Sequence, residues 1–119
     1  MACQTELLVR KYYETVDRGD VRSLLWLFDP EALYRRPGYP DLRGRSDLER
    51  FYREQRVISS GRHSIERLLI DRLGAAVYGR FHGLLRSGED IDLRFADFFE
   101  LSPVGMITHR DTFFFAPMV

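Results

Sequence analysis

One stretch of the chain, residues 91–101, carries a carboxylate where a strand would place it among apolar side chains. Positions 91, 93, 95, 97, 99 and 101 read Ile, Leu, Phe, Asp, Phe and Leu, and a β-strand directs alternate side chains to one face. Asp97 therefore stands between two phenylalanines. An unpaired carboxylate there is very costly, so Asp97 either finds hydrogen-bond donors or stays protonated. A protonated carboxyl could donate to a developing oxyanion, whereas a paired one would be structural.

A second polar pair lies in the last predicted strand, residues 106–115. His109 and Asp111 are two positions apart, so both point to one face, about 7 Å apart along the strand. Beside Asp97 they would put two carboxylates and an imidazole in one apolar cavity, a cluster that can divide acid and base roles. Alternatively, these side chains face solvent, or Asp111 pairs with a neighbouring arginine.

Tyrosine and arginine side chains provide further candidates. Tyr12 and Tyr52 lie on apolar faces of predicted helices, where a phenol usually finds a partner for its O–H. Tyr34 and Arg36 share one face of the first predicted strand. Arg36 could bind an anion or neutralise a carboxylate in a pocket, or it could face solvent.

Composition excludes several classes of function. The chain has 119 residues, 18 basic and 18 acidic side chains, and a formal net charge of zero, so we expect no nucleic-acid partner. Its single cysteine, Cys3, provides neither a disulfide framework nor a thiolate metal site. The sequence lacks a Walker-type loop, a G-x-G-x-x-G and an H-E-x-x-H motif. We therefore expect no metal and no cofactor.

Hydrophobic residues make up 45% of the chain, which is typical of a folded domain rather than a disordered segment. No stretch approaches the ~20 apolar residues of a membrane span, and the first 15 residues lack the apolar run of a signal peptide. We expect a cytoplasmic protein without a membrane partner, folded as one domain over residues 1–119.

Hydrophobic periodicity predicts the elements that must position these side chains. The period is near 3.6 in the first half and 2 in the second. Gly19 and Asp20 are typical of a helix end and the next helix start. Helices are predicted over residues 5–18, 20–28 and 47–57, a loop over 37–44, and strands over 31–36, 63–71, 75–87, 91–101 and 106–115. The order α-α-β-α-β-β-β-β indicates the α+β class.

This order, the opening with Tyr12, Gly19-Asp20 and Leu27-Phe28, and the long C-terminal hairpins resemble the nuclear transport factor 2-like superfamily. The resemblance covers nearly the whole chain. It implies a cone in which a curved antiparallel sheet packs on three N-terminal helices around a pocket. The superfamily includes enzymes and non-enzymes.

Ketosteroid isomerase-like members carry a tyrosine on helix 1, a Phe-Tyr pair on helix 3 and an aspartic acid on the penultimate strand. Tyr12, Phe51-Tyr52 and Asp97 are similar to those positions. The catalytic base of these isomerases is an Asp before a Pro on the first strand. This chain has Arg36 there, and arginine cannot act as a base at neutral pH.

Limonene epoxide hydrolase-like members offer a second comparison. Asp111 resembles their last-strand aspartate and Tyr34 their first-strand tyrosine, whereas Arg36 replaces their water-positioning Asn. Their second carboxylate is missing, because their Arg-x-Asp falls on residues 80–82, which read Arg-Phe-His. SnoaL-like polyketide cyclases are similar in length and pattern and also place acid–base residues in this pocket.

The leading hypothesis is a small acid–base enzyme that acts on a hydrophobic, oxygenated small molecule by isomerisation, cyclisation or dehydration. Asp97, helped by Tyr12 or Tyr52, would stabilise an enolate-like oxygen, and Asp111, alone or with His109, would move the proton. The positions expected to bind substrate are Tyr34, Arg36, Phe51, Tyr52, Phe95 and Phe113.

Two alternatives remain open. A side-chain-filled cone with Asp97 paired to an arginine would favour a non-catalytic binding or interaction domain. An epoxide hydrolase would need a water held by Asp111. The resemblance also implies a homodimer through the outer face of the sheet, where Phe98 and Phe114 are expected.

Overall fold

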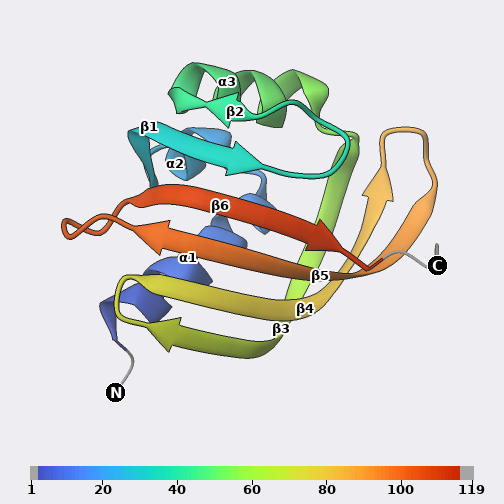
Figure 1. The fold of residues 1–119 in the computed structure, drawn as a ribbon. Helices are drawn as coiled ribbons and strands as arrows, with labels where there is room; N and C mark the ends of the chain where they lie inside the picture. The colour runs from blue at the N-terminus through green and yellow to red at the C-terminus, as the bar shows by residue number, and fades with distance from the viewer. Residues whose placement is uncertain (1–2, 116–119) are drawn as a thin grey trace.

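A six-stranded sheet curls around the N-terminal helix (Figure 1). The computed structural model describes residues 3–115. The elements are α1 (Gln4–Arg18), α2 (Val21–Leu25), β1 (Phe28–Arg35), β2 (Leu42–Arg43), α3 (Gly44–Arg50), the π-helical turn η1 (Phe51–Gln55), β3 (Ile58–Asp71), β4 (Gly74–Leu85), β5 (Asp90–Leu101) and β6 (Ile107–Phe114). The predicted α+β class and element order are confirmed.

The strands lie in the order β2-β1-β6-β5-β4-β3. All neighbours are antiparallel except β1 and β6, which run parallel. In Figure 1 helices α1 and α2 lie behind the sheet, so the sheet has an inner face toward them and an outer face toward the viewer. The core and the site described below lie on the inner face.

The boundary between α1 and α2 follows the sequence. Gly19 ends α1 in the left-handed conformation, with φ of 74°, which costs glycine little. Asp20 then caps α2 by accepting a hydrogen bond from the backbone N–H of Ser23 at 3.1 Å. Helix α1 buries Val9, Tyr12, Tyr13 and Val16, whereas Leu7 is 58% exposed. Both Tyr12 and Tyr13 therefore reach the core.

Several element boundaries differ from the prediction. β1 begins at Phe28, and the predicted loop over residues 37–44 contains the short strand β2. β3 begins at Ile58, before the start of the strand predicted over residues 63–71. These segments become strands by pairing with distant partners, which local propensity does not show.

The third helix begins at Gly44 and changes at Phe51 into the π-helical turn η1. The backbone N–H of Arg56 donates to the carbonyl of Phe51 at 2.8 Å, five residues back. Turns of this type occur often at functional sites. Here the turn directs Phe51 and Tyr52 inward, and both are buried.

Glycines on β3 and β4 make room for an aromatic ring. A Cβ atom added at Gly61 or Gly83 would lie 2.2 or 2.5 Å from the ring of Phe81. At Gly79 it would lie 2.2 Å from the carbonyl oxygen of Ser64 on β3. The glycines therefore allow close approach of the strands and of Phe81, whose ring fills part of the cone.

A β-bulge near the start of β6 decides which of its side chains point inward. Leu101 pairs with Ile107, but the preceding residue Glu100 pairs with His109, so Thr108 is the extra residue. A bulge of this kind shifts the alternation by one position. Ile107 and Arg110 consequently both point inward and are buried.

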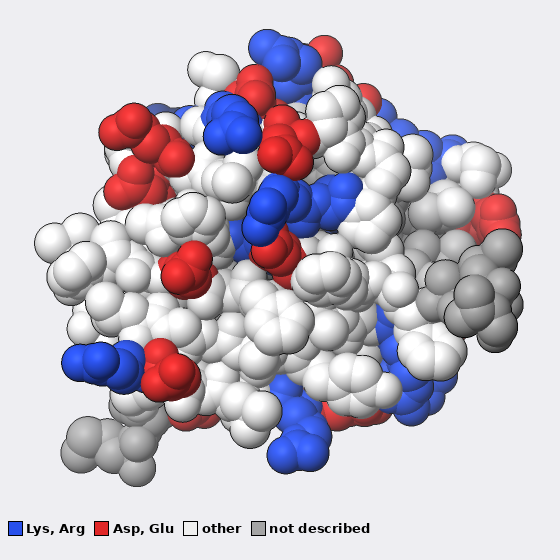
Figure 2. Space-filling model, in the orientation of Figure 1, with Lys and Arg blue, Asp and Glu red and all other residues white. Residues whose placement is uncertain are grey.

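Figure 2 shows the outer face of the sheet. Basic and acidic side chains are interspersed on this face, and neither sign gathers into a patch. Phe98 and Phe113 lie here, 52% and 54% exposed, with ring centroids 5.9 Å apart. Within residues 3–115, no helix has the length and apolar character needed to cross a membrane.

Candidate active site

The centre of the inner face is a buried ion pair between neighbouring strands. Arg110 of β6 donates through Nη2 to Oδ2 of Asp97 of β5 at 2.8 Å, and the two side chains are 5% and 0% exposed. Asp97 also accepts hydrogen bonds from the hydroxyls of Tyr13 and Thr112. Asp97 is therefore a fully partnered acceptor, as expected of a buried carboxylate, and it is not a protonated donor.

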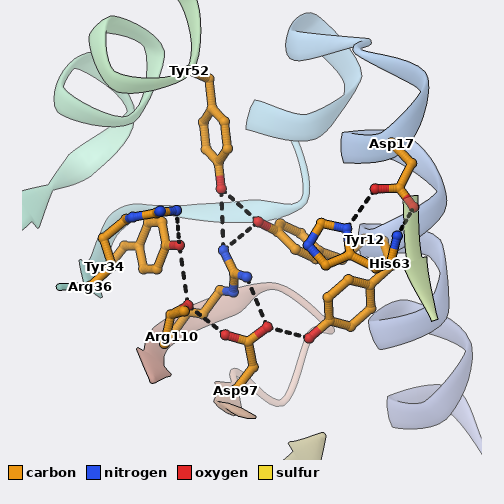
Figure 3. A network of polar contacts seen from close by, with 10 residues as sticks. Tyr12, Asp17, Tyr34, Arg36, Tyr52, His63, Asp97 and Arg110 are labelled. Carbon is orange, nitrogen blue, oxygen red and sulfur yellow. Dashed lines mark hydrogen bonds and ion pairs between the residues drawn. The ribbon is translucent and has the colours of Figure 1, made fainter. Parts of the chain in front are cut away.

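Aromatic rings surround the Arg110 guanidinium (Figure 3). Its central carbon lies 4.5 Å from the ring centroid of Tyr12 and 4.6 Å from that of Tyr34. Burial disfavours the charge, but the Asp97 carboxylate and the nearby tyrosine oxygens outweigh it and hold the pKa of Arg110 well above its usual value. Arg110 is thus a permanent cation in an aromatic box.

Two phenol groups lie at the tip of Arg110. Nη1 donates to the hydroxyl of Tyr12 and, at 3.4 Å, to that of Tyr52, while the two hydroxyls lie 2.6 Å apart. Burial raises the pKa of both phenols, so both keep their protons at neutral pH. One O–H is used between the two tyrosines, and the other remains available to a ligand oxygen.

A second arginine is connected to Asp97 through two hydroxyls. Because Thr112 donates to Asp97, its oxygen accepts from the Tyr34 hydroxyl at 3.2 Å. Tyr34 in turn accepts from Nη1 of Arg36 at 3.1 Å. The direction of every hydrogen bond in this chain is fixed by the two ends, a cation that only donates and a carboxylate that only accepts.

An imidazole faces the same region from the other side. Asp17, in the last turn of α1, accepts from the backbone N–H of His63 at 2.8 Å and contacts its Nδ1. A carboxylate partner fixes the proton on Nδ1 and leaves Nε2 as the acceptor. Burial lowers the pKa of His63, although Asp17 opposes this, so the ring is neutral at pH 7. Nε2 points away from Asp17 toward Tyr12 and Arg110 (Figure 3).

These groups share a small enclosed cavity of about 20 Å³, which is room for roughly one water molecule. Aromatic rings and one aliphatic side chain form most of its wall: Tyr12, Tyr52, Phe81, Phe95, Phe114 and Ile58. Its basic residues are Arg36, Arg56, Arg110 and His63. A wider surface pocket of about 280 Å³ adjoins it at Tyr52, Arg56 and Ile58.

Three buried donors on this wall have no acceptor. Within residues 3–115 the only buried side-chain polar atoms that lack a hydrogen-bond partner are the Nε atoms of Arg36, Arg56 and Arg110. Leaving a buried donor unsatisfied typically costs about 1–3 kcal/mol. All three arginines are among the residues that line this cavity.

Most of the predicted site residues do come together. Asp97 lies at the centre of the cluster, and Tyr12, Arg36, Tyr52 and Phe95 line the cavity. Tyr34 lies behind the residues that line the cavity. Its hydroxyl accepts a hydrogen bond from Arg36, and its ring packs against the guanidinium of Arg110. Phe51 lies behind Tyr52, with its ring 5.0 Å from Arg36.

The prediction that His109 and Asp111 share this cavity with Asp97 is wrong. Both side chains lie on the outer face, where Asp111 accepts two hydrogen bonds from Arg35 at 2.8 and 2.9 Å. His109 lies 3.4 Å from Glu100. The pairing of β5 with β6 places Asp111 beside Phe98 and Thr112 beside Asp97. Antiparallel partners share a face, so Asp111 points outward with Phe98.

The same register places Phe113 and Phe114 on the opposite faces of the sheet from those predicted. Phe113, expected to bind substrate, lies on the outer face and is 54% exposed. Phe114, expected on the outer face, lines the cavity instead. The alternation along residues 109–114 was recognised from the sequence, but the choice between its two faces needed the partner strand.

The sequence reading missed several contributors: Tyr13, Asp17, Arg56, His63, Arg110 and Thr112. Arg110 and Thr112 alternate with the residues that were chosen. His63 lies two positions before Ile65 on β3, so both side chains point to the same face of the strand. This alternation is a signal that predicts an inward-facing His63. No pattern pointed to Asp17 or Arg56, whose roles depend on contacts between elements.

Metal-ligating groups are scattered in this structure. Among residues 3–115, no three His, Cys, Asp or Glu side chains lie together as a set of ligands. The arginine-rich wall is better suited to an anion than to a cation.

Comparison with known structures supports the fold. The epoxide hydrolase/cyclase-like enzyme SalBIII, which has a role in pyran ring formation in the polyether salinomycin, superposes with a TM-score of 0.83 at 18% identity, covering 93% of this chain and 90% of that one. An NTF2-like protein of unknown function from Burkholderia pseudomallei K96243 gives 0.86 at 17% identity, over 96% and 92%. A candidate SnoaL-like polyketide cyclase from Shewanella putrefaciens CN-32 gives 0.82 at 14% identity, over 96% and 91%.

At these identities the structural matches show a shared fold and leave the chemistry open. A comparison with curated protein sequences found no match. The sequence of residues 9–110 matches the SnoaL-like domain. This range contains Asp97, Arg110 and their hydrogen-bond partners described above, except Thr112. The chain therefore belongs to the SnoaL-like domain family, with the fold of the nuclear transport factor 2-like superfamily.

Proposed function

We propose that the protein is an acid–base enzyme for a small oxygenated organic molecule and that His63 is its proton-transfer group. The observation that carries this proposal is the placement of His63. Its Nδ1 is held by Asp17, and its ring lines the cavity that also holds Arg110, Tyr12 and Tyr52. An oriented, neutral imidazole opposite a set of hydrogen-bond donors is the arrangement that enolisation requires.

In this mechanism Nε2 of His63 takes a proton from the carbon beside a carbonyl group. The electron pair moves onto the carbonyl oxygen, which accepts hydrogen bonds from the free O–H of the Tyr12–Tyr52 pair and from Arg110. In an isomerisation the proton then returns to another carbon. In a dehydration the enolate expels a β-hydroxyl group, which takes the proton from His63 and leaves as water. In a cyclisation the enolate carbon bonds to a second carbonyl carbon of the same molecule, and the oxygen of that carbonyl takes the proton. Asp97 is a positioning residue, because it acts through Arg110.

His63 thus has the proton-transfer role that the sequence predicts for His109 and Asp111. Their outer-face positions separate them from the donor cluster. The epoxide hydrolase alternative loses its support for the same reason, because it requires a water held by Asp111 in the cavity.

The test is solvent exchange, which needs no knowledge of the natural substrate. Wild-type protein is incubated in D₂O with enolisable ketones (cyclohexanone, 1-indanone and 2-tetralone), and deuterium incorporation is followed by proton NMR. We expect catalysed exchange that His63→Gln slows about 100-fold. His82→Gln is the matched control, because His82 has a 71% exposed side chain on the far side of β4.

A second candidate function is a ligand-binding domain without catalysis. The cavity is nearly filled, at about 20 Å³, and Asp97 is fully partnered. Exchange rates that are equal in wild type and His63→Gln for every ketone would favour this candidate and overturn the proposed enzyme.

A further inference from the structure

We infer that the cavity binds the carboxylate of its ligand between Arg36 and Arg56, so the ligand is a small organic acid with an apolar body. This inference rests on the same site as the proposed function and specifies the class of molecule that enters it. It starts from the distribution of charge around the cavity.

The charge of the cavity wall is unbalanced. Arg110 is compensated directly by Asp97. Arg36 reaches that carboxylate only through Tyr34 and Thr112. Within the described part of the chain, Arg36 and Arg56 make no ion pair, and no Asp or Glu lines the cavity. With His63 neutral, two positive charges face a cavity that contains no free carboxylate.

The two arginines line the same small cavity, and each lies against an aromatic ring of η1. Arg36 lies 5.0 Å from the ring centroid of Phe51, and Arg56 lies 5.9 Å from that of Tyr52. These rings are adjacent in η1, with centroids 5.0 Å apart. Both guanidinium groups also have a buried Nε–H without an acceptor, and both residues line the cavity. A carboxylate offers two oxygen atoms in one plane, which suits two such donors.

The shape of the surroundings selects a carboxylate on an apolar body. The cavity of about 20 Å³ admits one oxygen of a flat carboxylate and is too small for a tetrahedral phosphate. The adjoining pocket of about 280 Å³ shares Arg56, Tyr52 and Ile58 with it. The rest of its wall combines the apolar residues Val16, Val21 and Leu24 with Ser59 and Arg86. The head group would lie at the arginines and the body in this wider pocket.

The experiment is isothermal titration calorimetry with benzoate, phenylacetate and cyclohexanecarboxylate, each beside its neutral amide. We expect the acid to bind at least about tenfold more tightly than its amide. Arg36→Met and Arg56→Met should each weaken acid binding about tenfold and leave amide binding unchanged, because Met keeps length without charge. Arg53→Met is the matched control, since Arg53 lies on η1 but pairs with Glu49 on the surface.

Arg36→Lys and Arg56→Lys keep the positive charge, and they are the second variants to test if a methionine variant does not fold. Circular dichroism shows whether each variant is folded. Acids and amides that bind equally, an absence of binding by every acid, or methionine variants with wild-type acid affinity would each overturn the inference. His63→Gln separates this inference from the proposed function, because it should keep acid affinity while losing exchange activity. Tight acid binding without His63-dependent exchange would sustain the carboxylate site and reject the enzyme.

Discussion

Arg110 of β6 donates to Asp97 of β5 at 2.8 Å, and both side chains are almost completely buried. The pair joins two neighbouring strands and holds the guanidinium against Tyr12 and Tyr52. It therefore links the stability of the sheet to the geometry of the candidate site. A buried pair of this kind is costly to break from either side.

Replacing Asp97 with Asn should lower the free energy of unfolding by about 3–5 kcal/mol, because it leaves Arg110 as a buried uncompensated cation. Urea denaturation followed by fluorescence measures this loss. Asp111→Asn is the matched control, since Asp111 pairs with Arg35 on the exposed face of the same sheet and should matter much less. Equal losses in the two variants would contradict the central role of the buried pair.

The imidazole of His63 should titrate below its usual pKa of 6.5, because burial disfavours its charged form. Proton NMR of the ring protons against pH measures this directly. Asp17→Asn should lower the pKa of His63 further, because the Asp17 carboxylate raises it. A pKa for His63 that rises in Asp17→Asn would contradict the contact seen here.

The same shift predicts how stability depends on pH. The unfolded chain takes up a proton at His63 near pH 6.5, whereas the native protein takes it up only at lower pH. The free energy of unfolding should therefore be highest above pH 6.5, fall as the pH drops below 6.5, and level off below the native pKa. His63→Gln should flatten this region of the pH–stability curve, and a curve that keeps its wild-type shape in this variant would contradict the shift.

Gly79→Ala should destabilise the sheet by about 1–3 kcal/mol. The added Cβ would lie 2.2 Å from the backbone carbonyl oxygen of Ser64, which cannot move without disturbing β3. Gly74→Ala, on the same strand, is the control, because its nearest contact would be an ordinary 3.4 Å. Thermal unfolding of both variants by circular dichroism tests the difference, and equal melting temperatures would contradict it.

We propose that the protein forms a homodimer through the outer face of its sheet. Phe98, Phe113 and Leu69 are 52%, 54% and 57% exposed there, and exposed apolar groups of this size favour association. Sedimentation velocity should give a dimer for wild type and a monomer for Phe98→Glu. Leu7→Glu, on the exposed side of α1, should remain dimeric. A monomeric wild type at micromolar concentration would reject the proposal.

Much of the fold follows from local patterns. The change of hydrophobic period from 3.6 to 2 separates the helices from the sheet, and Gly19 and Asp20 mark the junction of the first two helices because of their backbone and capping chemistry. The isolated carboxylate of the penultimate strand was also visible, since Asp97 interrupts a run of apolar side chains on one face. These features depend on neighbours in sequence, which the sequence displays directly.

The partner of that carboxylate was decided by tertiary structure. The residues of β6 alternate between two polar faces, and both contain groups suited to Asp97: His109 and Asp111 on one, Arg110 and Thr112 on the other. The bulge at Thr108 and the pairing of Asp97 with Thr112 select the second face. A one-residue shift in register reverses every side chain of a strand, and only the hydrogen bonds of the folded sheet fix that register.

Tertiary structure likewise brings together His63 and Asp17, which are 46 positions apart, and directs Arg36 and Arg56 into one cavity. The sequence by itself determined the α+β class and the order of the elements, and it showed a carboxylate on an apolar face of the penultimate strand. The folded structure decided that this carboxylate binds an arginine and that an imidazole and two uncompensated arginines face the remaining space. The physical reason is that periodicity reports which side of an element is buried, whereas a site depends on which buried sides meet.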